Sequence, residues 1–319
     1  MMRQEINSFP KQFSFEPKLA NAGGLKKFSR VVVAGMGGSN LAAGLIKILC
    51  RNVEIIAHRS YGLPQLKSFK DTLIIANSYS GNTEETVDAY KIALKKKLPV
   101  AVIATGGTLL QLAKKNATPY IQMPDIGLQP RMALGLNLMA HLKFIDPVVM
   151  KKLKALERTL DVARYEAEAK ILVKKLRDKI PIIYASAENQ ALAYIWKIKF
   201  NETSKIPAFY NAFPELNHNE MNGFDAVAAT RQLSANAHFI FLRDANDHPK
   251  IQKRMRVTEV LYGNRALPVM AVDFDSRHLH SLFGLLVYGD WVSYYLAEYY
   301  GVEAEQVPMV EEFKKKIKS

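Results

Sequence analysis

The chain has 319 residues, of which 49% are hydrophobic and 23% are charged. This composition is typical of a soluble globular protein and excludes a fibrous or low-complexity chain. The length suits two domains with sizeable cores. With 44 lysine and arginine residues against 30 acidic residues, the net charge of +14 favours anionic partners such as phosphorylated metabolites.

Other partners are less compatible with the sequence. The basic residues are spread along predicted helices, without zinc-finger spacing or an aromatic RNP pattern, so we expect no nucleic-acid partner. No apolar stretch reaches the ~20 residues of a membrane span, and the N-terminus lacks the apolar core of a secretory signal. We therefore expect a cytoplasmic protein without membrane contact. The single cysteine, Cys50, lies in an apolar run and is expected to be buried and inert.

The first half of the chain alternates strands with helices. Strands are expected within residues 29–38, 53–60, 71–80, 98–107 and 117–125. Helical periodicity within residues 40–50, 80–97 and 108–116 connects them. This βαβ rhythm predicts an α/β fold with a parallel sheet covered by helices on both faces.

The rhythm begins again after a helical linker at residues 151–180. Strands are expected within residues 179–187, 235–244 and 267–275, and helices within residues 188–205, 248–263, 281–301 and 303–319. The sequence therefore predicts two similar α/β domains, residues 1–150 and 151–319.

A glycine-rich turn, Gly35-Met36-Gly37-Gly38-Ser39, ends the first predicted strand. Glycines at such a turn allow close approach of a ligand, and the backbone N–H groups of Gly37 and Gly38 can point at an anion. The turn is not a dinucleotide fingerprint, because the third glycine and the later acidic residue are missing. A simple tight turn is the alternative interpretation.

Three hydroxyl residues follow the third predicted strand: Ser78, Ser80 and Thr83, with Gly81 among them. Hydroxyls and free N–H groups at a helix N-terminus form a suitable cradle for a phosphomonoester. Helix capping is the alternative, but capping requires one hydroxyl and not three. The pattern favours phosphate binding.

These two motifs together resemble the sugar isomerase (SIS) domain. The resemblance implies flavodoxin-like domains, each an α-β-α sandwich with a mainly parallel five-stranded sheet, that bind phosphosugars. It also implies that Ser39, Ser78, Ser80 and Thr83 are phosphate ligands.

Two motifs of the second half extend the resemblance. They are Asn-Glu-x-x-Lys around Glu202 and Pro-Glu-x-x-His-Asn-Glu-x-x-Gly-Phe around His218. With the first two motifs in the same order, from about Val31 to Lys314, the chain resembles the bifunctional phosphoglucose/phosphomannose isomerases. The implied reaction interconverts glucose 6-phosphate, and also mannose 6-phosphate, with fructose 6-phosphate. The implied partners are a phosphorylated hexose and a second copy of the chain.

The resemblance assigns roles to four side chains. Glu202 transfers the proton between C2 and C1, and His218, from the neighbouring subunit, protonates the ring oxygen during ring opening. Arg131 stabilises the charge of the enediolate, and Lys314 in the C-terminal helix assists ring opening. Each residue also has an alternative interpretation when taken singly: Glu202 as a surface carboxylate, His218 as a loop histidine and Arg131 as a structural residue. The C-terminal helix could be a charged amphipathic end helix, and in another register Lys315 or Lys316 would match in place of Lys314. Glu215 and Glu220 flank His218 and are expected to shape its loop.

No metal site and no cofactor are expected, since the remaining histidines have no ligand spacing. Two other functions share part of the pattern. A regulator that senses sugar phosphates would keep the phosphate loop but gives no reason for Glu202, His218 and Arg131 together. An isomerase of another phosphosugar would share the early motifs.

Overall fold

The computed structural model describes residues 1–25 and 28–317. The chain divides into two compact units. We call residues 8–159 the N-terminal unit, and residues 1–7 together with 160–319 the C-terminal unit. Each unit is an α/β structure, as the sequence predicts.

The N-terminal unit contains a six-stranded sheet in the order β1-β6-β5-β4-β2-β3. The strands are β1 (Leu19–Ala20), β2 (Arg30–Ala34), β3 (Glu54–His58), β4 (Thr72–Asn77), β5 (Val100–Ala104) and β6 (Tyr120–Gln122). The five predicted strands β2 to β6 are parallel to one another. The two-residue β1, which pairs antiparallel with β6, was not predicted.

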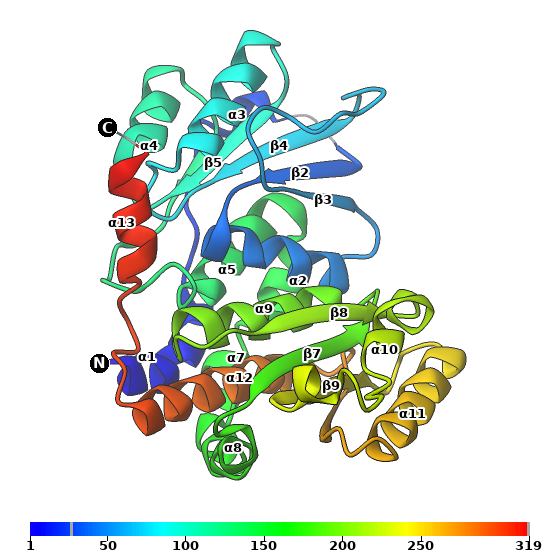
Figure 1. Cartoon of the computed structure of the whole chain (residues 1–319). Helices are drawn as coiled ribbons and strands as arrows, with labels where there is room; N and C mark the ends of the chain where they lie inside the picture. Colours follow the sequence, from blue (N-terminus) through cyan, green and yellow to red (C-terminus); the bar gives the residue numbers. More distant parts are fainter. Residues whose placement is uncertain (26–27, 318–319) are drawn as a thin grey trace. The chain divides into compact units, whose positions relative to one another are not determined.

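Helices cover both faces of this sheet (Figure 1). They are α2 (Leu41–Leu49), α3 (Glu84–Lys95), α4 (Gly107–Lys115), α5 (Leu134–Ile145), α6 (Pro147–Leu153) and α7 (Leu156–Thr159), with 3₁₀ turns η1 (Phe9–Ser14), η2 (Ala22–Gly24) and η3 (Gly37–Asn40). Val31 and Val33 pack toward α2 and α5, whereas Val32 packs toward α3 and α4. Because neighbouring strand residues point to opposite faces, a strand buried on both sides must be apolar throughout.

The C-terminal unit contains four parallel strands in the order β10-β9-β7-β8. They are β7 (Ile180–Ser186), β8 (Phe209–Phe213), β9 (Ala237–Asp244) and β10 (Val269–Phe274). The expectation of five strands is not met, because the sheet has four within the described residues. The edge strand β8 was not predicted: it is short, carries Asn211 at its centre and lies between Pro207 and Pro214, so its sequence resembles a loop.

Three long helices of this unit pack together: α8 (Val162–Leu176), α9 (Gln190–Glu202) and α12 (Leu279–Tyr300). The opposite face of the sheet packs against α11 (Pro249–Gly263) through Met255 and Tyr262. The remaining helices and turns are α1 (Met2–Ser8), α10 (Glu220–Gly223), α13 (Pro308–Lys316), η4 (Glu215–His218) and η5 (Arg231–Ser234). Across the described residues, none of these helices combines the length and apolar character that a bilayer span requires.

Candidate active site

Both sheets have the same strand order around one inner strand, β2 in the N-terminal unit and β7 in the C-terminal unit. β2 lies between β3 and β4, and β7 lies between β8 and β9. In open α/β sheets, ligands bind outside the carboxyl ends of the strands at such a switch point. The glycine-rich turn follows β2 and the hydroxyl-rich loop follows β4. Hydrogen bonding of neighbouring strands thus brings these two motifs to one switch point.

The hydroxyl-rich loop folds around the Ser78 side chain, which is fully buried. The Ser78 hydroxyl accepts hydrogen bonds from the backbone N–H groups of Gly81 (3.1 Å) and Thr83 (3.4 Å), and its oxygen lies 2.8 Å from the Thr83 hydroxyl. A hydroxyl has one proton and two lone pairs. Because both lone pairs of Ser78 are in use, its proton points to Thr83. The Thr83 proton is then available to an acceptor outside the loop.

Helix capping does not account for Thr83. It is the N-cap residue of α3, yet its side chain makes no capping hydrogen bond. The first backbone N–H groups of a helix have no acceptor within the helix, and the helix dipole favours an anion there. Ser80 is exposed beside them, and its hydroxyl accepts a hydrogen bond from the Asn82 backbone at 3.3 Å. The loop therefore presents hydroxyl and N–H donors at the start of α3.

A second loop holds the hydroxyl-rich loop in place. Thr105 donates through its backbone N–H and its hydroxyl to the carbonyl of Tyr79, at 2.9 and 2.7 Å. Thr108 donates through the same two groups to the Asn82 side chain, at 3.0 Å each. At Gly81 the backbone has φ +73°, and an added Cβ would lie 1.9 Å from the carbonyl oxygen of Gly106. Only glycine fits this contact.

The glycine-rich turn meets both the hydroxyl-rich loop and Arg131. The Ser39 hydroxyl accepts a hydrogen bond from the Tyr79 backbone at 2.9 Å. An added Cβ at Gly38 would lie 2.6 Å from the backbone nitrogen of Arg131. Arg131 itself is only 2% exposed and precedes α5. The structure therefore brings Gly37, Gly38, Ser39, Ser78, Ser80, Thr83 and Arg131 to one edge of the N-terminal unit, although their roles stay predictions.

Sequence reasoning missed Asn77, the last residue of β4. Its side-chain amide donates to the Ser39 carbonyl at 2.5 Å and to the Asn137 side chain at 2.9 Å, and it is fully buried. It therefore ties the glycine-rich turn to α5. A polar amide at the end of the apolar strand Leu-Ile-Ile-Ala could have revealed it, because a buried amide needs partners.

Glu202, His218 and Lys314 belong to the C-terminal unit. Glu202 is half-buried at the end of α9, where Lys205 donates from its ammonium to the Glu202 carbonyl at 2.5 Å. Asn201 donates to the Ile206 carbonyl at 2.9 Å. The asparagine and lysine of the Asn-Glu-x-x-Lys motif thus close the helix end. Lys314 is exposed on α13 and forms an ion pair with Glu311 at 2.7 Å.

Glu202 and His218 lie at opposite ends of β8. Helix α9 leads from the carboxyl end of β7 back to the amino end of β8 (Figure 1). The turn η4, which ends at His218, follows the carboxyl end of β8. The four steps between the first and last residues of this strand, at ~3.3 Å each, separate its ends by about 13 Å. Among the described residues of one chain, no hydrogen bond or ion pair joins the Glu202 carboxylate to the His218 imidazole.

The switch point of the C-terminal unit has a different chemistry. The Asn189 amide donates to the carboxylates of Asp244 and Asp247 at 3.0 and 3.1 Å. Burial raises the pKa of Asp247; at Asp244 the opposing hydrogen bonds from Ser276, Asn246 and Asn189 outweigh burial and lower the pKa. An anionic edge of this kind repels a phosphate.

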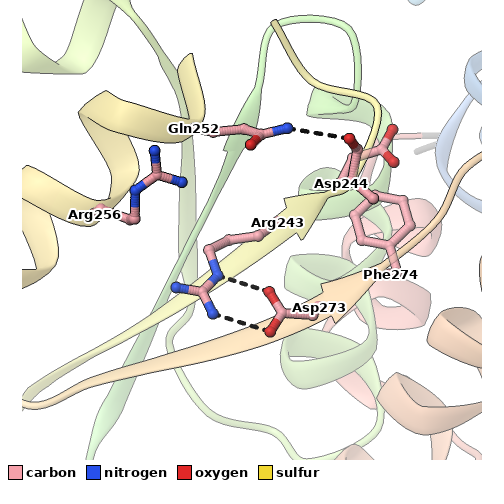
Figure 2. Close-up of a pocket in the computed structure, with 7 residues that line it drawn as sticks. Arg243, Asp244, Gln252, Arg256, Asp273 and Phe274 are labelled. Atoms are coloured by element: carbon pink, nitrogen blue, oxygen red, sulfur yellow. Dashed lines mark hydrogen bonds and ion pairs between the residues drawn. The ribbon is translucent and has the colours of Figure 1, made fainter. Parts of the chain in front are cut away.

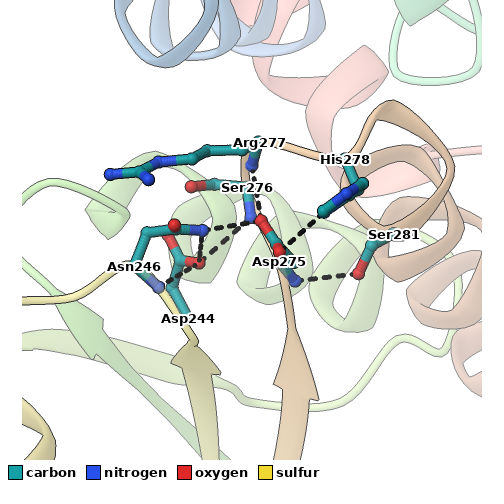
Figure 3. A network of polar contacts seen from close by, with 7 residues as sticks. All are labelled: Asp244, Asn246, Asp275, Ser276, Arg277, His278 and Ser281. Atoms are coloured by element: carbon teal, nitrogen blue, oxygen red, sulfur yellow. Dashed lines mark hydrogen bonds and ion pairs between the residues drawn. The ribbon is translucent and has the colours of Figure 1, made fainter.

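The polar groups around Asp244 and Asp275 also satisfy one another (Figure 3). The Asp244 carboxylate accepts from the backbones of Asn246 and Ser276 at 3.0 Å each. The Asp275 carboxylate lies 2.6 Å from the His278 ring and accepts from the Arg277 backbone at 2.8 Å. The Arg277 contact first, then hydrogen bonds from Asn246 and His278, lower the pKa of Asp275.

A pocket of about 280 Å³ beside α11 contains none of the residues singled out in the sequence (Figure 2). Its most buried cation, Arg243, is held by the Asp273 carboxylate at 2.7 and 2.9 Å and by Glu259 at 3.1 Å. Gln252 donates to the carbonyl of Ala245 at 3.1 Å. Because Arg243 is already neutralised, the pocket does not replace the N-terminal switch point as the candidate anion site.

Comparisons with known proteins identify the relatives of this chain. Residues 165–317 match the bacterial phospho-glucose isomerase C-terminal SIS domain. The bifunctional phosphoglucose/phosphomannose isomerase of Caldicellulosiruptor bescii is 36% identical, over 90% of this chain and 89% of that protein. The protein of the same name from Thermoplasma volcanium is 35% identical, over 91% and 92%.

Solved structures show the same fold. The C-terminal domain of glucosamine-fructose-6-phosphate aminotransferase from Francisella tularensis superimposes with a TM-score of 0.65, covering 96% of this chain and 98% of that one. Its identity of 15% supports the fold alone. The extent and identity of the sequence relatives go further: this chain belongs to the bifunctional phosphoglucose/phosphomannose isomerase family.

Proposed function

We propose that this chain is an isomerase that interconverts glucose 6-phosphate, and also mannose 6-phosphate, with fructose 6-phosphate. The observation that carries the proposal is the cradle of hydroxyl and N–H donors at the N-terminal switch point, in a chain that belongs to this isomerase family. The chemistry of the acidic C-terminal switch point supports one phosphosugar site per chain, in the N-terminal unit.

The phosphate is held by the two loops of the N-terminal switch point. Ser39, Ser78, Ser80 and Thr83 contribute hydroxyls, and the first turn of α3 and the glycine-rich turn contribute N–H groups. Gly37 and Gly38 keep the backbone of that turn accessible to the ligand. Arg131 stabilises the negative charge of the enediolate oxygen from its position beside Gly38.

Proton transfer follows opening of the sugar ring. His218 protonates the ring oxygen as the bond from C1 to that oxygen breaks, assisted by Lys314. Glu202 then removes the proton from C2 and returns it to C1 through the enediolate. Because hydrogen moves between two carbons of one molecule, the reaction needs no external oxidant, reductant or cofactor.

The active unit of the proposal is a homodimer. Glu202 and His218 of one chain are separated by the length of β8, and both must approach neighbouring atoms of one hexose. A second copy of the chain resolves this conflict by supplying its His218 to the site that contains Glu202. The position of β8 between the two residues supports this arrangement.

The test is a coupled assay of the purified full chain with glucose 6-phosphate and mannose 6-phosphate. We expect turnover of both, and a loss of about 10²–10⁴-fold in kcat for Glu202→Gln, the usual contribution of a general base. Full activity of Glu202→Gln would contradict the assigned base. Turnover of pentose or amino-sugar phosphates in place of both hexoses would contradict the assigned substrate.

A further inference from the structure

His218 is placed on a short exposed loop, yet its proposed role requires a fixed position. The imidazole belongs to the last residue of η4 and is exposed. Among the described residues, its ring forms no hydrogen bond that would orient it. Its position is therefore set by the backbone on either side and by the contacts that hold that backbone.

Glu220, two residues after His218, is bound to the sheet through both carboxylate oxygens. One oxygen accepts a hydrogen bond from the Tyr184 hydroxyl at 2.5 Å. The other accepts a short hydrogen bond from the Asn211 amide. Tyr184 and Asn211 are directly opposite each other on β7 and β8. The two donors thus form a socket on one face of the sheet, into which the Glu220 carboxylate fits.

The socket is rigid on the tyrosine side. The Tyr184 ring is fully buried and packs against Phe213, Phe239 and Phe241, with ring centroids 5.5 to 5.9 Å apart. Burial first, and the nearby carboxylate of Glu220 among the further causes, raise the pKa of Tyr184. The phenol therefore stays protonated and donates to Glu220 throughout the neutral range.

The residue before His218, Asn217, is also held by hydrogen bonds. The Asn217 side-chain amide donates to the Thr258 hydroxyl on α11 at 2.9 Å, and Arg254 donates to the side-chain oxygen of Asn217 at 3.4 Å. Contacts at positions 217 and 220 leave His218 between two anchors. Of these, the Glu220 anchor is charged and makes two hydrogen bonds, so its loss leaves a buried phenol and an amide without their acceptor.

We propose that Glu220 is a positioning residue, which acts through the socket of Tyr184 and Asn211 to hold His218 where it meets the ring oxygen of the substrate. This rests on the proposed function. Glu220 is not the proton-transfer base, because both of its oxygens already accept hydrogen bonds from the protein.

A double-mutant cycle tests the proposal. We expect Glu220→Ala to lower kcat for glucose 6-phosphate about as much as His218→Ala, roughly 10²-fold, with the inhibition constant of inorganic phosphate unchanged. In the His218→Ala background, Glu220→Ala should change kcat by less than about twofold, since residues that act as one unit are not additive. Glu220→Gln should retain part of the activity, because its amide oxygen can still accept one of the two hydrogen bonds.

Tyr184→Phe removes only the hydroxyl that donates to Glu220 and keeps the buried ring. It therefore tests the socket with a smaller risk of a folding defect than Glu220→Ala. It should lower kcat less than Glu220→Ala and leave phosphate inhibition unchanged. The matched control is Tyr90→Phe, which removes another buried hydroxyl, bonded to Thr118 at 2.8 Å in the N-terminal unit. This control should leave kcat unchanged.

Hydrogen exchange supplies a readout that does not depend on activity. Residues 214–223 should exchange faster in Glu220→Ala and Tyr184→Phe than in the wild type, but not in Tyr90→Phe. Unchanged exchange in this segment would overturn the anchor. Equal losses from Glu220→Ala in both backgrounds would show that Glu220 acts independently of His218. Full activity of His218→Ala would overturn the inference while leaving the isomerase activity itself established.

Discussion

The side-chain amide of Asn77 donates a hydrogen bond of 2.5 Å to the backbone carbonyl of Ser39. This contact joins the end of β4 to the glycine-rich turn after β2. It also positions Ser39 so that its hydroxyl meets the Tyr79 backbone. The glycine-rich turn and the hydroxyl-rich loop therefore form one hydrogen-bonded structure and not two independent turns.

Replacing Asn77 should test this coupling. Asn77→Asp puts an acceptor where the Ser39 carbonyl needs a donor, so we expect a loss of about 1–3 kcal/mol in the free energy of unfolding and weaker inhibition by inorganic phosphate. Urea denaturation and phosphate competition measure the two effects. The exposed Asn116→Asp is the control, because Asn116 bonds only to its own helix end and to the Tyr90 hydroxyl. Equal effects at both positions would refute a special role for Asn77.

Gly81→Ala should disrupt the hydroxyl-rich loop. A Cβ there would overlap the Gly106 carbonyl, and the left-handed backbone adds about 1–2 kcal/mol of strain. Gly127 has φ +77° with nothing within 4 Å of an added Cβ, so Gly127→Ala measures the strain alone. We expect Gly81→Ala to be the less stable variant by thermal unfolding and to lose phosphate affinity. Similar melting temperatures for the two variants would argue against the steric contact.

Thr83→Val should weaken substrate binding, because it removes a donor to the ligand and also the acceptor of the Ser78 proton. The Thr83 proton is assigned to the ligand, and a hydrogen bond to a charged group contributes about 1.5–3 kcal/mol. We therefore expect KM to rise by about 10- to 100-fold, and Thr83→Ser to restore most of the affinity. Steady-state kinetics with both hexose phosphates provide the measurement. An unchanged KM in Thr83→Val would remove Thr83 from the phosphate site.

Mixing two inactive variants should restore activity if His218 comes from the partner subunit. In a heterodimer of Glu202→Gln and His218→Ala, one of the two sites contains both an intact Glu202 and an intact His218. After subunit exchange in equal amounts, about a quarter of the wild-type kcat should return, because half of the dimers are mixed and each has one complete site. No recovery in a preparation shown to contain heterodimers would place both residues in the same chain's site.

Two buried histidines predict a loss of stability in mild acid. Burial lowers the pKa of His141 to about 4, partly offset by the Asn137 carbonyl, and burial with Lys175 and Lys179 lowers that of His238 to about 4. The folded state is not penalised by these histidines above pH 6.5, the pKa of a histidine in the unfolded chain. Its stability falls as the pH drops from 6.5 toward 4, because the unfolded chain then binds protons that the buried histidines do not. Between pH 7 and 4.5 each histidine should cost about 2–3 kcal/mol of unfolding free energy.

His141→Gln isolates one of these histidines. The His141 ring nitrogen Nδ1 lies 2.7 Å from the Asn137 carbonyl, and a glutamine amide can replace that donor without a titrating group. Urea denaturation at several pH values should show a shallower decline in this variant. An identical pH dependence in wild type and variant would exclude His141 as a source.

Much of the fold follows from the sequence because strand periodicity and helix signals are local. The buried strands β2, β4 and β5 each have a continuous apolar run, at residues 31–34, 73–76 and 100–104, so their type is clear from composition alone. The type of strand β8 is not clear from its composition. It contains Asn211, whose side chain bonds to Glu220 in the folded protein, and prolines flank it on both sides. Its pairing with β7 is a tertiary contact without a local signal.

The candidate site was predictable in part for the same reason. Hydroxyls and glycines at strand ends indicate two loops that lie at one edge of the sheet, since parallel strands end at a common edge. Their phosphate-binding role stays a prediction. The contact of Gly38 with the Arg131 backbone joins residues more than ninety positions apart, and no local pattern specifies it. The separation of Glu202 from His218 likewise depends on the unpredicted β8.

The closed network at the carboxyl ends of β9 and β10 means that the two halves of the chain are not interchangeable. The asparagine side chains there donate hydrogen bonds to the aspartate carboxylates of the same unit. A chimera of two C-terminal units in tandem would retain the strand order but have no place to anchor a sugar phosphate. The edge that we assign to phosphate in the N-terminal unit therefore corresponds, in the C-terminal unit, to an edge whose polar side chains bond to one another.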